Sequence, residues 1–425
     1  MIPRIVNRKL PFYYGWLVLF SAGLSMFVRN SAGSLTLAVF VYPMETDLGW
    51  SRTEIAGAAS LGGLLSIVGA PITGWACDKF GVRWVLVIGV LLLGITTISL
   101  SWATLLVTFY AAFGFARLLF TGPIPIGASV VVSRWFVRMR GRANGILFFC
   151  HAVGMAVFPY VAFLFIQSRG WKDAWVLLGI MVWIFALLPV LLFIRQNPES
   201  VGLLPDGERA NELENSLQEK KPEEPMWSLR QALGAPSLWL LAIATGLLYL
   251  IQSGTNMHQG AYFIDQGLSV KISALAVSGS GVMAGLGTLG WGWLVEKIPV
   301  RFAFMGVGLV IAVAIGLFPQ ADTAIEALAY AGLFGVGVAG MLVVPPVAYA
   351  NYFGRGSLGA IRGVTETLVA LGQAIGAVLS GYIFDVTGTY LAAFYGFAVV
   401  GVITIVLLML ATPPKNKGNF IPELE

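Results

Sequence analysis

Runs of apolar residues separated by short polar segments dominate the pattern of this 425-residue chain. A helix needs roughly 20 apolar residues to cross the hydrocarbon core of a bilayer, and each run is close to that length or longer. The pattern therefore predicts an all-α membrane protein with twelve transmembrane helices. We expect spans at residues 14–41, 54–76, 84–101, 104–133, 142–167, 173–194, 235–263, 272–295, 302–319, 324–351, 361–384 and 389–411.

One segment between the sixth and seventh runs breaks this pattern. Residues 195–230 contain four prolines among many charged residues, which is typical of a solvated linker. A short surface helix is expected within it, around Gly207–Lys220. The chain is therefore predicted to divide into an N-terminal six-helix bundle at 1–194, a cytoplasmic linker at 195–230 and a C-terminal six-helix bundle at 231–425.

A local pattern around Asp78 recurs 218 residues later around Glu296. The first copy reads GWACDKFGVR at 74–83 and the second reads GWLVEKIPVR at 292–301. In each copy a long apolar run ends in a short charged turn, and glycine, acid, lysine and arginine keep their positions.

The same offset carries Gly145 onto Gly363 and Gly170 onto Gly388. A repeat of a whole hydrophobic half predicts two bundles related by a pseudo-twofold axis. Secondary transporters are the commonest proteins of this kind, and they place one substrate site between the halves.

Composition agrees with a membrane protein, because 57% of the residues are apolar, only 11% are charged and the mean hydropathy is +0.82. A soluble domain carries about 25% charged residues. The net charge of +5 does not indicate a nucleic-acid partner, since the basic residues lie in short loops between apolar runs. We find no nucleophile constellation, metal-ligand cluster or phosphate-binding loop. The chain is therefore not expected to be an enzyme or to need a cofactor or metal.

The distribution of Lys and Arg predicts the orientation in the membrane. With both termini placed inside, 20 of the 26 basic residues fall in inner segments and four in outer ones. The remaining two, Arg29 and Arg117, lie within spans. We expect a multi-pass protein of the bacterial cytoplasmic (inner) membrane with both termini in the cytoplasm.

The doubled pattern resembles the signature between helices 2 and 3 of the major facilitator superfamily, Gly-x-x-x-Asp-Arg/Lys-x-Gly-Arg/Lys-Arg/Lys. Other segments are similar to the monocarboxylate transporter and oxalate/formate antiporter branch. They are YGW at 14–16, LGWSR at 48–52, WF at 135–136 followed by RGRANG at 140–145, and GYIFDVTGTY at 381–390. The resemblance implies the twelve-helix major facilitator fold and transport of a small organic anion.

The branch typically carries a basic residue, often with an acid, inside helix 8. Helix 8 of this chain, Ile272 to Val295, contains neither before Glu296. The ionisable residues that would bind the substrate and the proton are therefore expected in other helices.

Ionisable groups within a span are costly and mark candidate functional sites. Arg29, followed by Asn30, lies near the middle of the first span, and a guanidinium can pair bidentately with a carboxylate. Its alternative is a structural ion pair or a position near the outer surface. Arg117 lies in the fourth span before Gly122 and Pro123. It is predicted either to bind substrate or to satisfy the broken backbone near Pro123.

His151 and His258 are the only two histidines. Histidine changes charge near neutral pH, so these residues are candidates for contact with substrate or proton, together with Asn256 beside His258. The alternative for each histidine is a neutral side chain hydrogen-bonded across helices.

The acids of the two motif copies lie at inner helix ends, where a carboxylate can meet the positive N-terminus of another helix. The resemblance implies that Asp78 contacts the start of helix 11 and that Glu296 contacts the start of helix 5. We assign Asp78, Lys79, Arg83, Glu296 and Arg301 to gating, with a plain solvated turn as the alternative.

The sequence thus predicts a secondary active transporter of a small organic anion, with a monocarboxylate favoured, which works by alternating access. Proton symport and anion exchange both fit. The alternative carrier is an exporter of drugs or other hydrophobic compounds. An enzyme lacks a catalytic cluster, a receptor would need larger soluble domains, and a channel does not fit the gated layout. The expected partners are the substrate, protons and the bilayer, and we expect a monomer.

Overall fold

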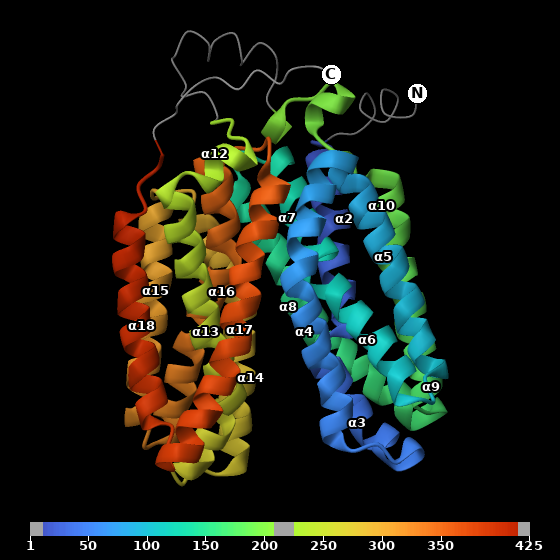
Figure 1. The fold of residues 1–425 in the computed structure, drawn as a ribbon, viewed down its shortest axis with the longest axis vertical. Helices are drawn as coiled ribbons and strands as arrows, with labels where there is room; N and C mark the ends of the chain where they lie inside the picture. Colours follow the sequence, from blue (N-terminus) through green and yellow to red (C-terminus); the bar gives the residue numbers. More distant parts are fainter. Residues whose placement is uncertain (1–11, 208–224, 415–425) are drawn as a thin grey trace. The chain divides into compact units, whose positions relative to one another are not determined.

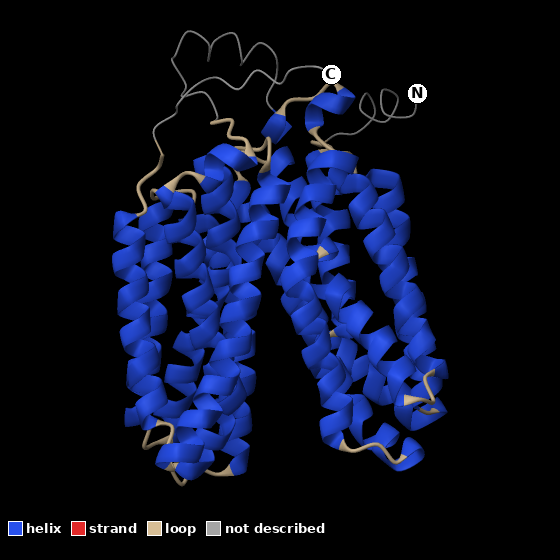
Figure 2. Ribbon diagram, in the orientation of Figure 1, coloured by secondary structure: helices blue, strands red, loops and turns tan. Residues whose placement is uncertain are grey.

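The computed structural model describes residues 12–207 and 225–414. All regular elements in these ranges are helices, and Figure 2 shows no strand there. The all-α class is thereby confirmed. The surface helix expected around Gly207–Lys220 falls almost wholly outside the described residues.

Eleven apolar helical segments in the described ranges are long enough to cross a membrane. One of them, Gly57–Trp102, is 46 residues long and contains most of α4 (Arg52–Ala76) and all of α5 (Val82–Ser99), joined through η2 (Cys77–Gly81). About 20 residues suffice for one crossing, so this segment holds two spans. The chain is a multi-pass membrane protein, and the twelve predicted spans are present.

The chain divides into two compact units. Within the described ranges, unit 1 consists of residues 12–143, 150–207 and 357–364. Unit 2 consists of residues 144–149, 225–356 and 365–414. A short piece of helix α8 therefore packs with unit 2, and the start of helix α17 packs with unit 1.

The helices are coloured by sequence in Figure 1. Those of the first half are α2 (Gly15–Val28), η1 (Arg29–Ala32), α3 (Ser34–Leu48), α4, η2, α5, η3 (Leu100–Trp102), α6 (Leu106–Thr121), α7 (Pro123–Trp135), α8 (Arg140–Arg169), α9 (Trp171–Val182), η4 (Trp183–Leu187), α10 (Leu188–Phe193), η5 (Pro198–Val201) and η6 (Pro205–Gly207). Those of the second half are α12 (Leu229–Leu233), α13 (Pro236–Asp265), α14 (Val270–Leu294), α15 (Val300–Leu317), η7 (Phe318–Gln320), α16 (Ala324–Phe353), α17 (Leu358–Thr387) and α18 (Leu391–Leu410).

The first span is longer than the sequence pattern predicted. Helix α3 continues to Leu48 instead of ending near residue 41, and it tolerates Pro43 within it. Gly49 then ends the helix in the left-handed conformation, with φ of 71°, which glycine adopts at little cost. Ser51 and Glu54 form a reciprocal capping box that starts α4 two residues later.

The repeat offset also relates backbone conformations in the two halves. Gly170 ends α8 with φ of 88°, and Gly388 follows α17 with φ of 71°. The motif turn differs, because Gly81 has φ of 90° whereas Pro299 has φ of −52°. Proline cannot adopt a positive φ, so the second motif copy has to turn in another way.

Candidate functional site

The first span is broken at its middle. Helix α2 ends at Val28, the four buried residues of η1 form a tight turn, and α3 restarts after an extended Gly33. Arg29 therefore lies at a helix break instead of within a continuous helix. Such a break leaves backbone carbonyl groups without their usual helical partners, and in a membrane other groups must satisfy them.

The fourth span is broken as well. Helix α6 ends before Gly122, whose φ and ψ of −100° and −92° are not helical, and α7 begins at Pro123. Pro123 and Pro125 have no N–H to donate to the preceding turn. Arg117 lies on α6, four residues before the helix ends at Thr121.

Two arginines connect the two breaks in unit 1. Arg29 Nη1 donates to the Phe120 carbonyl at 3.0 Å, beside the break in the fourth span. Arg117 Nη1 donates to the Ala32 carbonyl at 3.4 Å, at the break in the first span. Both guanidinium carbons lie 4.5 Å from the centre of the Phe120 ring, a cation–π distance.

This arrangement changes one interpretation of the sequence. From the sequence, Arg117 was a candidate to satisfy the broken backbone near Pro123, because both residues lie on the fourth span. In the structure Arg29 of the first span does so, by donating to the Phe120 carbonyl. Spacing along one helix does not show which neighbouring helix faces its break.

His151 of α8 completes the group. Its Nδ1 lies 3.3 Å from Arg29 Nε and 3.1 Å from Asn30 Nδ2. Asn30 also donates to the His151 carbonyl at 3.1 Å. The close approach of α8 depends on Gly154, because a Cβ there would clash with the Phe27 carbonyl.

Four of the predicted binding residues, Arg29, Asn30, Arg117 and His151, thus gather in unit 1. With Phe120 they form what we call the arginine cluster. Phe120 was missed in the sequence; its signal is an aromatic side chain three residues after Arg117 and two residues before Gly122.

The charge of the arginine cluster is positive. Before Asp173 the only acidic residues of the chain are Glu45, Asp47, Glu54 and Asp78, and each lies at or near the end of a helix. Arg117 Nε is buried and has no hydrogen-bond partner in the described part of the chain. A buried donor is costly to leave unsatisfied, so an anion or a water molecule is the natural acceptor there.

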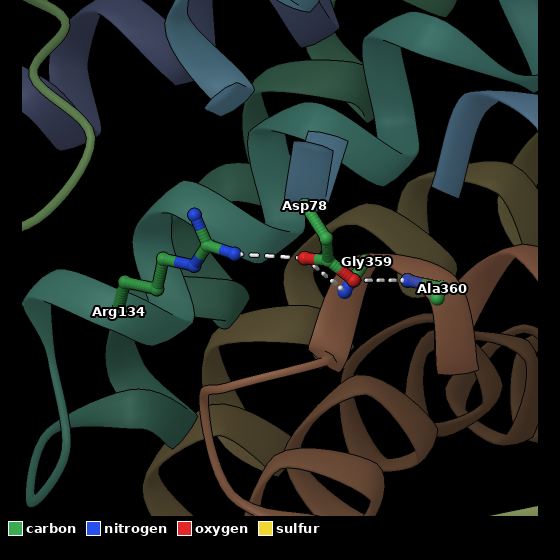
Figure 3. Close-up of polar contacts among 4 residues, drawn as sticks. All are labelled: Asp78, Arg134, Gly359 and Ala360. Carbon is green, nitrogen blue, oxygen red and sulfur yellow. Dashed lines mark hydrogen bonds and ion pairs between the residues drawn. The ribbon is translucent and has the colours of Figure 1, made fainter. Parts of the chain in front are cut away.

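A second polar group lies at the first motif copy (Figure 3). Asp78 Oδ1 accepts a hydrogen bond from Arg134 Nη2 at 2.8 Å. The carboxylate also accepts from the backbone N–H groups of Gly359 at 3.2 Å and Ala360 at 2.7 Å, in the first turn of α17. An acid at a helix N-terminus is stabilised by the helix dipole and by its unsatisfied N–H groups. The expected contact between Asp78 and helix 11 is therefore present.

Comparison with known families decides the class. The profile of the Major Facilitator Superfamily matches residues 15–364. The chain belongs to the major facilitator superfamily. It is thus a transporter, as the doubled motif predicted, and not an enzyme.

Similar proteins within the superfamily include monocarboxylate transporters. Monocarboxylate transporter 12-B of Danio rerio is 23% identical, with 97% of this chain and 91% of that protein covered. Monocarboxylate transporter 13 of Rattus norvegicus is 28% identical, with coverage of 90% and 85%. The uncharacterized transporter YcxA of Bacillus subtilis is 20% identical, with coverage of 88% and 90%. The resemblance to the monocarboxylate branch is confirmed.

Solved structures share the superfamily fold. The proton:xylose symporter XylE aligns with a TM-score of 0.73 at 13% identity, covering 93% of this chain and 95% of that one. The human organic anion transporter MFSD10 aligns with a TM-score of 0.68 at 16% identity, covering 94% and 100%. At these identities the likeness shows the fold alone.

Glycines of the superfamily motif allow close helix packing, and they do so in matched pairs. A Cβ on Gly363 would lie 2.6 Å from the Ala70 carbonyl and 3.1 Å from the Gly74 Cα, within unit 1. A Cβ on Gly145 would lie 2.6 Å from the Thr288 carbonyl and 3.3 Å from the Gly292 Cα, within unit 2. The 218-residue offset exchanges these two pairs, so the repeat is one of packing as well as sequence.

The remaining motif residues have other surroundings. Arg83 donates to the Leu191 carbonyl near the end of α10 at 3.0 Å. The Lys79 ammonium lies 4.7 Å from the centre of the Trp75 ring, and the Arg301 guanidinium lies 5.1 Å from that of Phe302. Glu296 is half-buried in the turn after α14.

The candidates on α13 belong to unit 2, whereas the arginine cluster belongs to unit 1. His258 Nδ1 lies 3.1 Å from the Tyr390 hydroxyl and Nε2 lies 3.4 Å from the Ala377 carbonyl. Burial raises the pKa of Tyr390, and Asp265 and Asp385 add to this, so its hydroxyl can donate to Nδ1. Both ring nitrogens of His258 thus have hydrogen-bond partners. Asn256 is exposed and accepts from Gln259 at 3.4 Å.

Proposed function

We propose that this superfamily member is a secondary active transporter of a small organic anion, with a monocarboxylate as substrate. The carrying observation is the arginine cluster, in which two guanidinium groups converge on one phenylalanine ring at two helix breaks. Broken helices that meet near the middle of the membrane are the usual place for a transporter's substrate site.

The chemistry of the cluster supports an anion. A guanidinium presents paired N–H donors that match the two oxygens of a carboxylate. Arg29 would hold the carboxylate, and the unsatisfied Nε of Arg117 offers a further donor nearby. Phe120, whose ring centre lies 4.5 Å from both guanidinium carbons, would contact the carbon skeleton of the anion.

The names of the relatives also support an organic anion as the substrate. Several similar proteins are monocarboxylate transporters, and one structure with the same fold is an organic anion transporter. They support the substrate class, and the cluster supplies a physical reason for it. Proton symport and anion exchange both remain compatible with this function.

Alternating access would use the motif residues as a gate on the inner side. Asp78 fits this role, because its carboxylate joins the first turn of α17 to Arg134 of α7. Glu296 is proposed to act in the same way by its equivalent place in the repeat. Lys79, Arg83 and Arg301 would anchor these turns at the membrane surface. We further propose a monomer in a bacterial cytoplasmic membrane, with both termini inside.

The test is uptake into proteoliposomes of purified protein, measured with a panel of labelled carboxylates with and without a pH gradient. We expect saturable uptake of at least one monocarboxylate and none of a neutral sugar of similar size. A matched preparation carrying Arg29→Gln and Arg117→Gln should lose uptake. Transport of apolar cations or neutral drugs without transport of any carboxylate would overturn the proposal.

A further inference from the structure

The protonation of one ring nitrogen of His151, in the arginine cluster, leads to a proposal that rests on the proposed function. His151 Nδ1 lies 3.3 Å from Arg29 Nε and 3.1 Å from Asn30 Nδ2. Both can only donate hydrogen bonds, so Nδ1 has to accept and carries no proton. In this state His151 is neutral, with its hydrogen on Nε2.

Two contacts of the Arg29 guanidinium bear on how a carboxylate can approach it. Nη1 donates to the Phe120 carbonyl at 3.0 Å, and Nε donates to His151. A carboxylate that binds side-on requires Nε together with Nη2. Binding in this way therefore keeps the backbone contact of Nη1 and displaces His151 from Nε.

Displacement changes what His151 can do. Its Nδ1 loses the guanidinium donor and comes to face a carboxylate oxygen. The charged groups around the ring are Arg29, in direct contact, and Arg117, which shares the Phe120 ring. An incoming carboxylate neutralises the positive charge around the ring, so a proton from the aqueous side can add to Nδ1. The new N–H group can then donate a hydrogen bond to the carboxylate.

We propose that His151 is the coupling residue of the carrier, which exchanges its contact with Arg29 for a proton when the substrate carboxylate binds. One N–H bond forms at Nδ1 as one O–H bond of an aqueous hydronium ion breaks and water is released, so each anion enters the site with one proton. Asn30 has to turn its amide, because its NH₂ group can no longer face Nδ1.

The other histidine provides a control. His258 is hydrogen-bonded to the Tyr390 hydroxyl and to the Ala377 carbonyl, and it has no arginine contact in the described structure. Replacing it leaves a protein with one natural histidine, since the chain has two. A ¹⁵N-histidine label in His258→Gln protein, after removal of any affinity tag, therefore reports on His151 alone.

The first measurement is the ¹⁵N spectrum of this protein with and without a transported monocarboxylate. We expect the neutral Nε2–H form without substrate and the doubly protonated ring with substrate at the same pH. An unchanged neutral spectrum with saturating substrate would overturn the coupling role.

The second measurement compares binding across pH in the parent and in His151→Asn. An Asn side chain places its carbonyl oxygen near the position of Nδ1, so it can still accept from Arg29 but cannot be protonated. Parent affinity should rise up to about tenfold for each unit by which the pH is lowered, because one proton binds with each anion. In His151→Asn this dependence should fall below about twofold over the whole range, while His258→Gln keeps it.

The outcomes separate the two proposals. If the parent binds and transports no carboxylate, the proposed function fails. If it binds a carboxylate with no pH dependence, or if His151→Asn retains the parent's dependence, the coupling role of His151 fails and the function stands. If His151→Asn still exchanges one carboxylate for another without moving protons, the result agrees with the coupling role, because only the proton step depends on His151.

Discussion

At the scale of single residues, Arg29 performs two tasks that a lysine could not combine. Its planar guanidinium contacts the Phe120 carbonyl and His151 at once, and it lies against the Phe120 ring. The donors of a guanidinium point in fixed directions, so one edge can hold the protein while another holds a ligand. The residue is therefore part of both the helix break and the proposed site.

Replacing Arg29 by Gln is expected to weaken binding of the substrate carboxylate by about 2–5 kcal/mol, since the anion then enters a low-dielectric site without its counter-charge. Arg29→Lys should recover only part of this loss. Binding to folded protein in detergent is the measurement, with Arg169→Gln, at the exposed C-terminal end of α8, as the control. Affinity of Arg29→Gln within twofold of the parent would contradict the assignment.

At the scale of elements, the start of α17 is held by a carboxylate from the turn between α4 and α5. Asp78 supplies acceptors for two N–H groups of that helix and also pairs with Arg134, whose side chain is only 8% exposed. Glycines on both helices let their backbones touch at this point. The contact is thus both electrostatic and steric.

Asp78→Asn should loosen this contact by about 0.3–2 kcal/mol, the range of helix-dipole interactions. The reporter is Ala360→Cys in protein carrying Cys77→Ala and Cys150→Ala, because residue 360 is buried in the contact. Its labelling rate should increase several-fold with Asp78→Asn, and by less with Glu296→Gln, which belongs to the less well matched motif copy. Equal labelling and equal transport in all variants would indicate a merely solvated turn.

Gly145→Ala and Gly363→Ala should each destabilise the protein by about 1–3 kcal/mol, because the added methyl meets a backbone carbonyl and cannot be accommodated by a side-chain rotation. The control is Gly279→Ala on α14, where a Cβ would meet nothing within 4 Å. That change should be neutral or slightly stabilising, since alanine favours helix. Thermal unfolding in detergent measures all three. A control as unstable as the two variants would count against the packing argument.

At the scale of the whole molecule, the chain is two halves that share a sequence repeat and the glycine contacts that go with it. Each compact unit also includes a short piece of helix from the other half, 144–149 in one case and 357–364 in the other. These pieces are the starts of α8 and α17, which the repeat makes equivalent.

The orientation of the molecule can be tested directly. A reporter that fluoresces only in the cytoplasm, fused after residue 425, should be active, and an alkaline phosphatase fusion at the same point should be inactive. The physical reason is that 20 of the 26 basic residues then lie on the inner side. The opposite pair of activities would reverse the topology.

The sequence by itself determined the class, the twelve spans and the repeat, because lipid requires long apolar helices and a duplication leaves its offset in the residue order. It also singled out Arg29, Asn30, Arg117 and His151, since polar groups in a span stand out against an apolar background. It did not show that these four meet, and it missed Phe120, which looks like any other aromatic residue of an apolar run.

Only the tertiary structure decided which helix faces which break. The contacts of Arg29 to Phe120 and of Arg117 to Ala32 join residues that are 91 and 85 positions apart, and helix periodicity carries no information over that range. The same holds for the two histidines, which the sequence could not distinguish. Neighbours from other helices place one histidine beside an arginine and the other beside a tyrosine.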